Sequence, residues 1–280
     1  MNAEQCFESL LELAVQEDLG SVGDVTSQAI FKDETTQAVL YSKDEGVLAG
    51  TDFFTRVYHR IDPSVKVEFK KNDGDFLHRG DLVAVIYGKT LSILSAERIS
   101  LNFLGYLSGI ASSAKRMKDI AGGHTTILDT RKTLPGYRAL AKWAVLKGGA
   151  SNHRMGLFDM VMIKDNHIDA AGGISEAVKK VRNAWGETYR IEVECRTIDE
   201  VKEALDNQVD IIMLDNMDTE TVASAVALKR EGVSFESSGD MDEHKVAQYS
   251  GLGVDFISAG RLTHSVRSFD FSLQIGQKTE

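Results

Sequence analysis

From about residue 125 onward, short apolar runs alternate with amphipathic stretches, and this alternation leaves few possible architectures. The runs TTILD, MVMIK, YRIEVE, DIIML, SFESS and DFISA begin near residues 125, 160, 189, 210, 234 and 255. The segments between them, such as 173–185, 197–207 and 218–231, have helical periodicity, and Thr197 and Asp218 are typical N-caps. Repeated βα units predict parallel strands. Six of them favour a (β/α) barrel over an open doubly wound sheet, although eight strands are usual. No G-x-G-x-x-G follows a strand, so a dinucleotide fold lacks its main support.

The first part of the chain has a different pattern. Residues 3–19 place apolar side chains at helical spacing, with Gly20 as a plausible stop, and predict an amphipathic helix. Between residues 37 and 94, short apolar runs broken by turn sequences indicate antiparallel β structure. Residues 96–121 predict a long helix that joins a first domain, 1–110, to a second, 111–265.

Charge is distributed unevenly along the chain. The formal net charge is −10, from 32 basic and 42 acidic residues, which argues against a general polyanion binder. Residues 130–167, however, hold seven basic and two acidic side chains, a local balance of +5 that leaves −15 for the rest. Any phosphate site must therefore be local. Lys142 and Lys147 are equally well explained as the solvated face of a helix.

The cysteine content and hydropathy suggest a cytoplasmic protein. Cys6 and Cys195 are too few and too far apart for a disulfide framework or a cysteine-based zinc site, which suggests a reducing compartment. No apolar run approaches the roughly 20 residues that cross a bilayer. The first 20 residues carry acids and no Lys or Arg, unlike a secretory signal.

Polar residues follow the predicted strands, where active sites of βα barrels gather. Any one of them could be structural, but six strand ends in succession predict a site. These residues are Asp129, Thr130, Arg131, Lys132, Lys164, Asp165, Asn166, His167, Glu192, Glu194, Asp215, Asn216, Glu236, Ser237, Ser238, Gly239, Ser258, Ala259 and Gly260.

The chemistry of these side chains points to anionic ligands. Arg131, Lys132, Arg154 and Lys164 would repel one another at one barrel mouth unless an anion bound there. Glu194 and Asp215 suit sugar hydroxyls or a magnesium ion carried in with phosphate. The turns 238–239 and 258–260 are typical of loops that hold phosphate through main-chain N–H groups. A phosphosugar beside a carboxylated substrate fits this set.

Two other chemistries remain open from the residues alone. Lys164 on a barrel strand could form a Schiff base, as in aldolases. His153 and His167 could bind a metal with Glu194 or Asp215, although their spacing matches no zinc pattern. If Glu194 points into the barrel, strand alternation turns Cys195 outward into packing.

One continuous block carries a specific resemblance. LDTRKTLPGYRALAKWAVLKGGASNHRMGLFDMVMIKDNHI, followed by IEVEC, IIMLDN, ESSG and ISAGRLTHS, resembles the quinolinate phosphoribosyltransferase family, also called nicotinate-nucleotide pyrophosphorylase (carboxylating). The similarity runs from EDLGSVGDVTS to THSVRSFDFSL. A related molybdenum-associated, pyrophosphorylase-like group shares the Thr-Arg-Lys and His-Arg elements but departs from Ile-Lys-Asp-Asn-His. That group, acting on a different acceptor, is the alternative within this resemblance.

The resemblance implies an α/β fold and a pentosyltransferase activity. The fold would be an N-terminal α/β sandwich followed by an incomplete barrel of about six to seven strands, with the tail 266–280 packed back on the sandwich. The reaction would transfer phosphoribose from phosphoribosyl pyrophosphate to quinolinate, with Mg²⁺, to give nicotinate mononucleotide, pyrophosphate and CO₂ on the de novo route to NAD. A homodimer or a higher oligomer is implied. A sensor that binds quinolinate without turnover is the non-catalytic alternative.

The resemblance also implies roles for individual residues. Lys132, Glu194 and Asp215 would be catalytic and contact phosphoribosyl pyrophosphate, with Glu194 and Asp215 near its magnesium. Arg98 would reach the neighbouring subunit's site. The remaining substrate-binding residues would be Thr130, Arg131, His153, Arg154, Lys164, Ser238, Gly239, Asp240, Ser258, Ala259 and Gly260. Asp240 departs from the Ser-Gly-Gly loop of many relatives, and this places an acid beside a phosphate loop.

Overall fold

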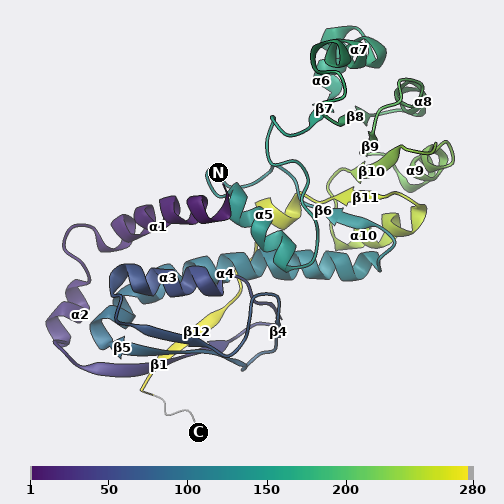
Figure 1. The fold of residues 1–280 in the computed structure, drawn as a ribbon. Coiled ribbons are helices and arrows are strands. Elements are labelled where there is room, and N and C mark those ends of the chain that lie inside the picture. Colours follow the sequence, from purple (N-terminus) through teal and green to yellow (C-terminus); the bar gives the residue numbers. More distant parts are fainter. Residues whose placement is uncertain (1, 277–280) are drawn as a thin grey trace. The chain divides into compact units, whose positions relative to one another are not determined.

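The computed structural model describes residues 2–276 and divides into two compact units (Figure 1). The N-terminal unit comprises residues up to 115 together with 134–149 and the described residues from 266. The barrel unit comprises residues 116–133 and 150–265. The boundary expected near residue 110 lies within one uninterrupted helix, α4 (Thr90–Ala121).

An antiparallel sheet of order β12-β1-β5-β3 forms the centre of the N-terminal unit. β12 pairs with β1 from Ala38↔Ile275 to Ser42↔Phe271, so the C-terminal segment is an edge strand of this sheet. The elements of the unit are α1 (Ala3–Leu19), α2 (Val25–Ile30), β1 (Thr35–Ser42), β2 (Gly46–Val47), α3 (Thr51–Ile61), β3 (Lys66–Phe69), β4 (Phe76–Leu77), β5 (Leu82–Lys89), most of α4, α5 (Arg138–Lys147) and β12 (Phe271–Ile275).

The predicted first helix is confirmed, because α1 spans Ala3–Leu19 and ends at Gly20. The prediction of β structure throughout 37–94 is wrong for α3, which lies inside that range. Phe53, Phe54, Val57 and Tyr58 are buried on one face of α3, with the i, i+4 spacing of a helix. Phe53 also stacks on Phe7 of α1 at 4.6 Å between ring centroids, so the helix completes the core.

One interpretation of the basic segment is corrected in this unit. Lys142 does not lie on a solvated helix face, because it is only 1% exposed within α5. Residues 134–149 belong to the N-terminal unit, where burial of this part of α5 overrides the polarity of one side chain. Lys147 lies over the ring of Trp143, with its Nζ 5.0 Å from the ring centroid.

The barrel unit contains a six-stranded parallel sheet of order β6-β11-β10-β9-β8-β7, so the predicted mixed α/β fold with a parallel second sheet is confirmed. Figure 1 shows α7, α8 and α9 along one side of its strands. The strands and helices of this unit are β6 (Thr126–Leu128), β7 (Val161–Ile163), α6 (Asp165–Ala171), α7 (Ile174–Trp185), β8 (Ile191–Cys195), α8 (Ile198–Asp206), β9 (Ile211–Asp215), α9 (Thr219–Val226), β10 (Ser234–Ser238), α10 (Glu243–Tyr249), a 3₁₀ turn (Ser250–Leu252), β11 (Phe256–Ser258) and α11 (Arg261–His264).

Local sequence signals account for this order. Each of the six apolar runs contains a strand, and the predicted caps form: Thr197 accepts a hydrogen bond from the N–H of Glu200, and Asp218 from that of Thr221. Cys195 is fully buried, as expected of a packing residue. Among residues 2–276, no helix has the length and apolar character needed to cross a membrane.

Candidate active site

The strand-end residues of the barrel unit lie at one edge of its parallel sheet. Arg131 and Lys132 follow β6, Lys164 directly follows β7, and Asp215 is the last residue of β9. Because all six strands run parallel, their carboxyl ends share this edge. The sheet therefore brings together predicted site residues that are far apart in the sequence.

Strand register places the two candidate magnesium ligands on one face of the sheet. Glu194 of β8 pairs with Met213 of β9, and Asp215 lies two residues beyond Met213. Because side chains alternate along a strand, Glu194 and Asp215 project to the same side. Both offer the carboxylate oxygens that a hard cation prefers, so the donor chemistry fits magnesium.

Glu194 is buried and forms an ion pair with Lys164. The Lys164 ammonium reaches the Oε2 atom of Glu194, whose residue is 8% exposed, while the lysine side chain is 43% exposed. The Lys164 amine is thus engaged by a carboxylate, whereas a Schiff-base lysine needs its amine free to attack a carbonyl carbon. The geometry therefore disfavours the aldolase-like alternative.

Arg154 lies close to a second cation. Its guanidinium donates to the main-chain oxygen of Met160 at 3.1 Å and lies 3.4 Å from the sulfur of Met162. Burial lowers the pKa of Arg154, and the charge of neighbouring Arg131 lowers it further. Two adjacent guanidinium groups in a half-buried position form a site for an anion that can accept hydrogen bonds from both.

His153 is held entirely by groups of the protein itself. Its Nε2 atom lies 3.2 Å from Glu192 Oε2 and 3.3 Å from Glu236 Oε2. Its main-chain N–H donates to Asp129 at 2.9 Å, and the N–H of Arg154 donates to its Nδ1 at 2.7 Å. Both ring nitrogens therefore face groups of the protein. We call His153, Glu192 and Glu236 the buried triad.

Burial and mutual contacts shift the pKa values of His153 and Glu192 within the buried triad. Burial lowers the pKa of the His153 ring, but the hydrogen bonds and charges of the two glutamates outweigh it and raise the pKa. Burial, with the charge of Glu236, raises the pKa of Glu192 to about 7. In the neutral ring, the Arg154 contact requires an unprotonated Nδ1, which places the ring proton on Nε2, facing the carboxylates.

The buried triad has the donor types of a metal site, with ligand atoms within 4.8 Å of one another. Its tautomer argues against a metal. A ligating imidazole normally donates its second N–H to the protein, but here Nδ1 accepts a hydrogen bond, and the remaining proton occupies Nε2. His167 lies elsewhere, on α6, where its Nδ1 accepts from the N–H of Lys164 at 3.0 Å.

The two expected phosphate loops are joined by an ion pair. The first loop, 238–240, contains Asp240 with φ +44°, and the second, 258–260, is followed by Arg261. The Arg261 guanidinium lies 3.4 Å from Asp240. Lys132 adjoins the second loop, because Thr263 donates to its main-chain oxygen at 2.8 Å. Gly239 has φ +118° and leaves no space for a Cβ atom, which would lie 2.2 Å from Asn216 Oδ1.

Three more of the predicted residues, Thr130, Ser258 and Ala259, lie at or just after the ends of β6 and β11. Thr130 accepts from the N–H of Lys132 at 3.0 Å and so shapes the turn after β6. Ser258 is buried at the end of β11, and the N–H of Ala259 donates to Leu128 at 2.9 Å.

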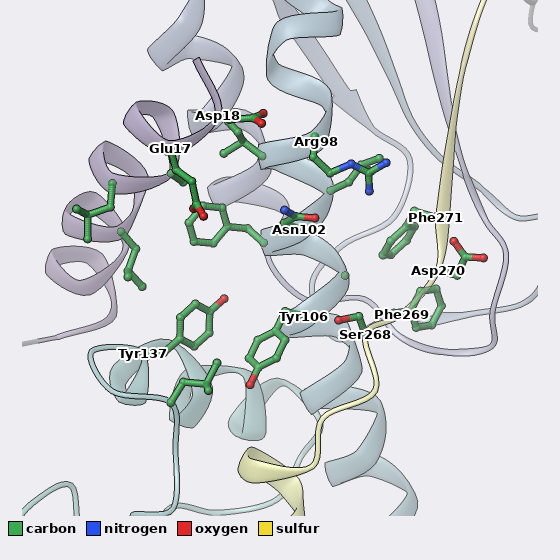
Figure 2. A pocket seen from close by; sticks show the side chains of 18 residues that line it. Glu17, Asp18, Arg98, Asn102, Tyr106, Tyr137, Ser268, Phe269, Asp270 and Phe271 are labelled. Carbon is green, nitrogen blue, oxygen red and sulfur yellow. The ribbon is translucent and has the colours of Figure 1, made fainter. Parts of the chain in front are cut away.

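Arg98 belongs to the N-terminal unit and lines a cavity there. This cavity of about 1000 Å³ lies between α1, α4, the segment that precedes α5 and the C-terminal segment. Figure 2 shows Arg98, Asn102 and Tyr106 along α4, with Glu17 and Asp18 on α1. The cavity mouth is partly apolar. Its lining residues Leu13 and Leu134 are 61% and 53% exposed.

Family models match almost the whole chain. The model described as quinolinate phosphoribosyl transferase, N-terminal domain, matches residues 24–108, and the corresponding C-terminal domain matches residues 110–274. The chain belongs to the quinolinate phosphoribosyltransferase family. Its relatives are therefore the family members that contain both of these domains.

Curated relatives extend over most of the chain. The nicotinate-nucleotide pyrophosphorylase [carboxylating], chloroplastic, of Arabidopsis thaliana is 43% identical over 288 residues, covering 96% of this chain and 82% of the relative. The probable nicotinate-nucleotide pyrophosphorylase [carboxylating] of Bacillus subtilis is 40% identical over 275 residues, covering 98% and 95%.

Solved structures agree with the sequence comparison. NadC from Streptococcus pyogenes superposes with a TM-score of 0.93 at 38% identity and covers 99% of each chain. The nicotinate-nucleotide pyrophosphorylase of Francisella tularensis gives 0.93 at 36% identity, with 97% of this chain and 96% of that one covered. These matches favour the quinolinate enzymes over the molybdenum-associated alternative.

Sequence reasoning gave no role to Glu192, Glu236 or Arg261. Glu192 and Glu236 were recognised only as polar strand-end residues. Glu192 lies two residues before Glu194 on β8, so strand alternation alone places both on the same face. That signal was present, but the meeting of both glutamates at His153 depends on tertiary structure.

Proposed function

We propose that this protein transfers the phosphoribosyl group of phosphoribosyl pyrophosphate to quinolinate, with loss of pyrophosphate and CO₂, to give nicotinate mononucleotide. Family membership over both domains supports this activity. The proposal is supported most directly by two features at the carboxyl ends of one parallel sheet, namely the closeness of Arg131 to Arg154 and the Lys164–Glu194 ion pair. A substrate with two adjacent carboxylates matches this cationic group.

The reaction needs positioning and charge stabilisation more than covalent chemistry. The ring nitrogen of quinolinate forms a bond to the anomeric carbon of ribose as the bond from that carbon to pyrophosphate breaks. Positive charge develops on the ribose, which Glu194 and Asp215 are placed to stabilise, while Lys132 neutralises the leaving pyrophosphate. The 2-carboxylate then leaves as CO₂, its bonding electrons pass to the cationic ring, and a proton replaces it on carbon.

Magnesium is part of this proposal. Bound with phosphoribosyl pyrophosphate, Mg²⁺ would offset the charge of the departing pyrophosphate. Glu194 and Asp215 are the residues that would contact it, since both carboxylates project from one face of neighbouring strands. Loops 238–240 and 258–260 would bind the phosphates.

The proposed active form is a homodimer in which Arg98 completes the partner's site. Arg98 lines a cavity in the N-terminal unit, and exposed Leu13 and Leu134 are the kind of apolar surface that a second subunit buries. In the barrel unit, Leu157 and Phe158 are 73% and 72% exposed just after Arg154. Arg98 and Arg154 thus each have exposed apolar side chains nearby, of a kind suited to an interface.

A cytoplasmic location is also proposed, supported by two buried free cysteines.

The decisive experiment is product analysis after the protein is mixed with quinolinate, phosphoribosyl pyrophosphate and Mg²⁺. Nicotinate mononucleotide and CO₂ should appear in equal amounts, and omission of any one component should abolish both. Quinolinate binding without product would support the sensor alternative instead.

Removing the carboxylate of Asp240 is expected to improve use of phosphoribosyl pyrophosphate. Asp240 is exposed, repels phosphate and engages Arg261, so Asp240→Asn should free that cation and lower KM for phosphoribosyl pyrophosphate about two- to fivefold. Asp240→Gly should do the same and also relieve the positive φ. Initial rates at varied phosphoribosyl pyrophosphate measure the effect.

A matched control is available in the same unit. Asp206, the last residue of α8, and Arg230, which lies between α9 and β10, form an ion pair of similar exposure, and Asp206→Asn should leave both KM values unchanged. An unchanged or raised KM for phosphoribosyl pyrophosphate in both Asp240 variants would contradict a repulsive role for this carboxylate.

A further inference from the structure

The buried triad is not accounted for by substrate contacts. Glu192 and Glu236 are fully buried, on strands β8 and β10, and both direct an oxygen at one atom, Nε2 of His153. Burying two carboxylates is costly unless they are paired. Pairing with His153 is therefore what offsets the cost of burying these two carboxylates.

His153 in turn is joined to the substrate site through its neighbour. Its Nδ1 accepts the main-chain N–H of Arg154, and its own N–H is held by the fully buried Asp129. The Asp129 contact fixes the main chain of His153, and the contacts at Nδ1 and Nε2 fix its ring, so together they fix where the Arg154 side chain begins. From there the Arg154 guanidinium lies near Arg131.

One of these carboxylates, Glu192, also acts on Arg154 through charge. Glu192 favours the cationic form of Arg154, against the effects of burial and of Arg131. When ionised, Glu192 offsets part of the repulsion that Arg131 exerts on Arg154 while no substrate is bound. It therefore helps to preorganise the pair for an incoming dicarboxylate.

We propose that Glu236 and Glu192 are positioning residues for the quinolinate pocket, which act through His153 to hold Arg154 beside Arg131. This inference rests on the proposed function. It also assigns His153 a role different from the one implied by family resemblance, because His153 supports the pocket rather than touching the substrate. The expected signature is selective: quinolinate binding depends on the buried triad, and phosphoribosyl pyrophosphate binding does not.

The test compares Glu236→Gln and Glu236→Ala in the full-length protein. Glutamine keeps the volume and can still accept the Nε2–H, but it removes the charge, whereas alanine removes both. We expect KM for quinolinate to rise about fivefold in Glu236→Gln and more than twentyfold in Glu236→Ala, with KM for phosphoribosyl pyrophosphate within twofold of wild type. Equilibrium titration with quinolinate alone should show the same order.

Ser237→Ala provides the matched control. Ser237 is the next residue on β10, equally buried, and strand alternation turns it to the opposite face. Its substitution should change neither KM. Glu192→Gln gives a second variant should Glu236→Ala fail to fold. Equal rises in both KM values, or no change in quinolinate binding in Glu236→Gln and Glu192→Gln, would overturn the inference. A wild-type protein that makes no nicotinate mononucleotide would instead refute the proposed function.

Discussion

Lys164→Ala is expected to lower kcat/KM for quinolinate by about two to three orders of magnitude. The variant loses a charge-assisted contact to a substrate carboxylate, typically worth about 1.5 to 3 kcal/mol. It also leaves Glu194 buried without its cationic partner, which adds to the cost. Steady-state rates at varied quinolinate, with phosphoribosyl pyrophosphate saturating, measure the effect.

Lys179→Ala is the control for this substitution. Lys179 lies on α7 of the same unit, where its exposed side chain pairs with Glu176 three residues away. Its loss should leave kcat/KM unchanged. A wild-type kcat/KM for quinolinate in Lys164→Ala would show that Lys164 does not contact the substrate. The Schiff-base alternative has its own outcome, because it requires that borohydride trap substrate on Lys164 of the wild-type protein.

The strands of the barrel unit were predictable because each is a short apolar run followed by a polar turn. Burial on both faces makes the strands of a parallel sheet read as continuous hydrophobic segments, a signal that needs no tertiary information. The helix α3 was missed because it lies between very short strands. Its helical spacing at Phe53, Phe54, Val57 and Tyr58 was nevertheless present.

The location of the candidate site was also predictable, but its pairings were not. The rule that sites lie at strand carboxyl ends gathered Arg131, Lys164, Glu194 and Asp215 without a structure. Which acid faces which base depends on strand order, and β8 and β10 are separated by β9 in the sheet. The convergence of Glu192 and Glu236 on His153 therefore appears only in three dimensions.

Lys142 is another residue whose surroundings depend on tertiary structure and not on local sequence. Its helical spacing among apolar neighbours was compatible with a solvated face, and its charge favoured that interpretation. The deciding fact is that residues 134–149 join the N-terminal unit, although they fall between segments of the barrel unit in the sequence. The local sequence pattern does not indicate that this segment belongs to a different unit from the segments on either side of it.

Mixing two inactive variants is expected to restore activity if Arg98 completes the partner's site. Arg98→Ala and Lys164→Ala should each be nearly inactive alone. In a mixed dimer, the subunit with the Arg98→Ala change keeps an intact barrel and receives Arg98 from its partner. Random reassociation of equal amounts makes half of the dimers mixed, each with one complete site of two. We therefore expect about one quarter of wild-type activity.

The experiment separates a shared site from one built within a single subunit. The two variants are unfolded together and refolded, or coexpressed with different tags and purified as mixed dimers. Activity equal to the sum of the separate residual activities would show that Arg98 acts within its own chain or not at all. Arg98→Ala mixed with Asp206→Asn serves as the control, because Asp206 lies on the outer helices of the barrel unit, away from the strand-end residues. In that mixture the Asp206→Asn subunits supply Arg98 and also retain complete barrels. Half of all sites then receive Arg98, and the expected activity is about one half of wild type.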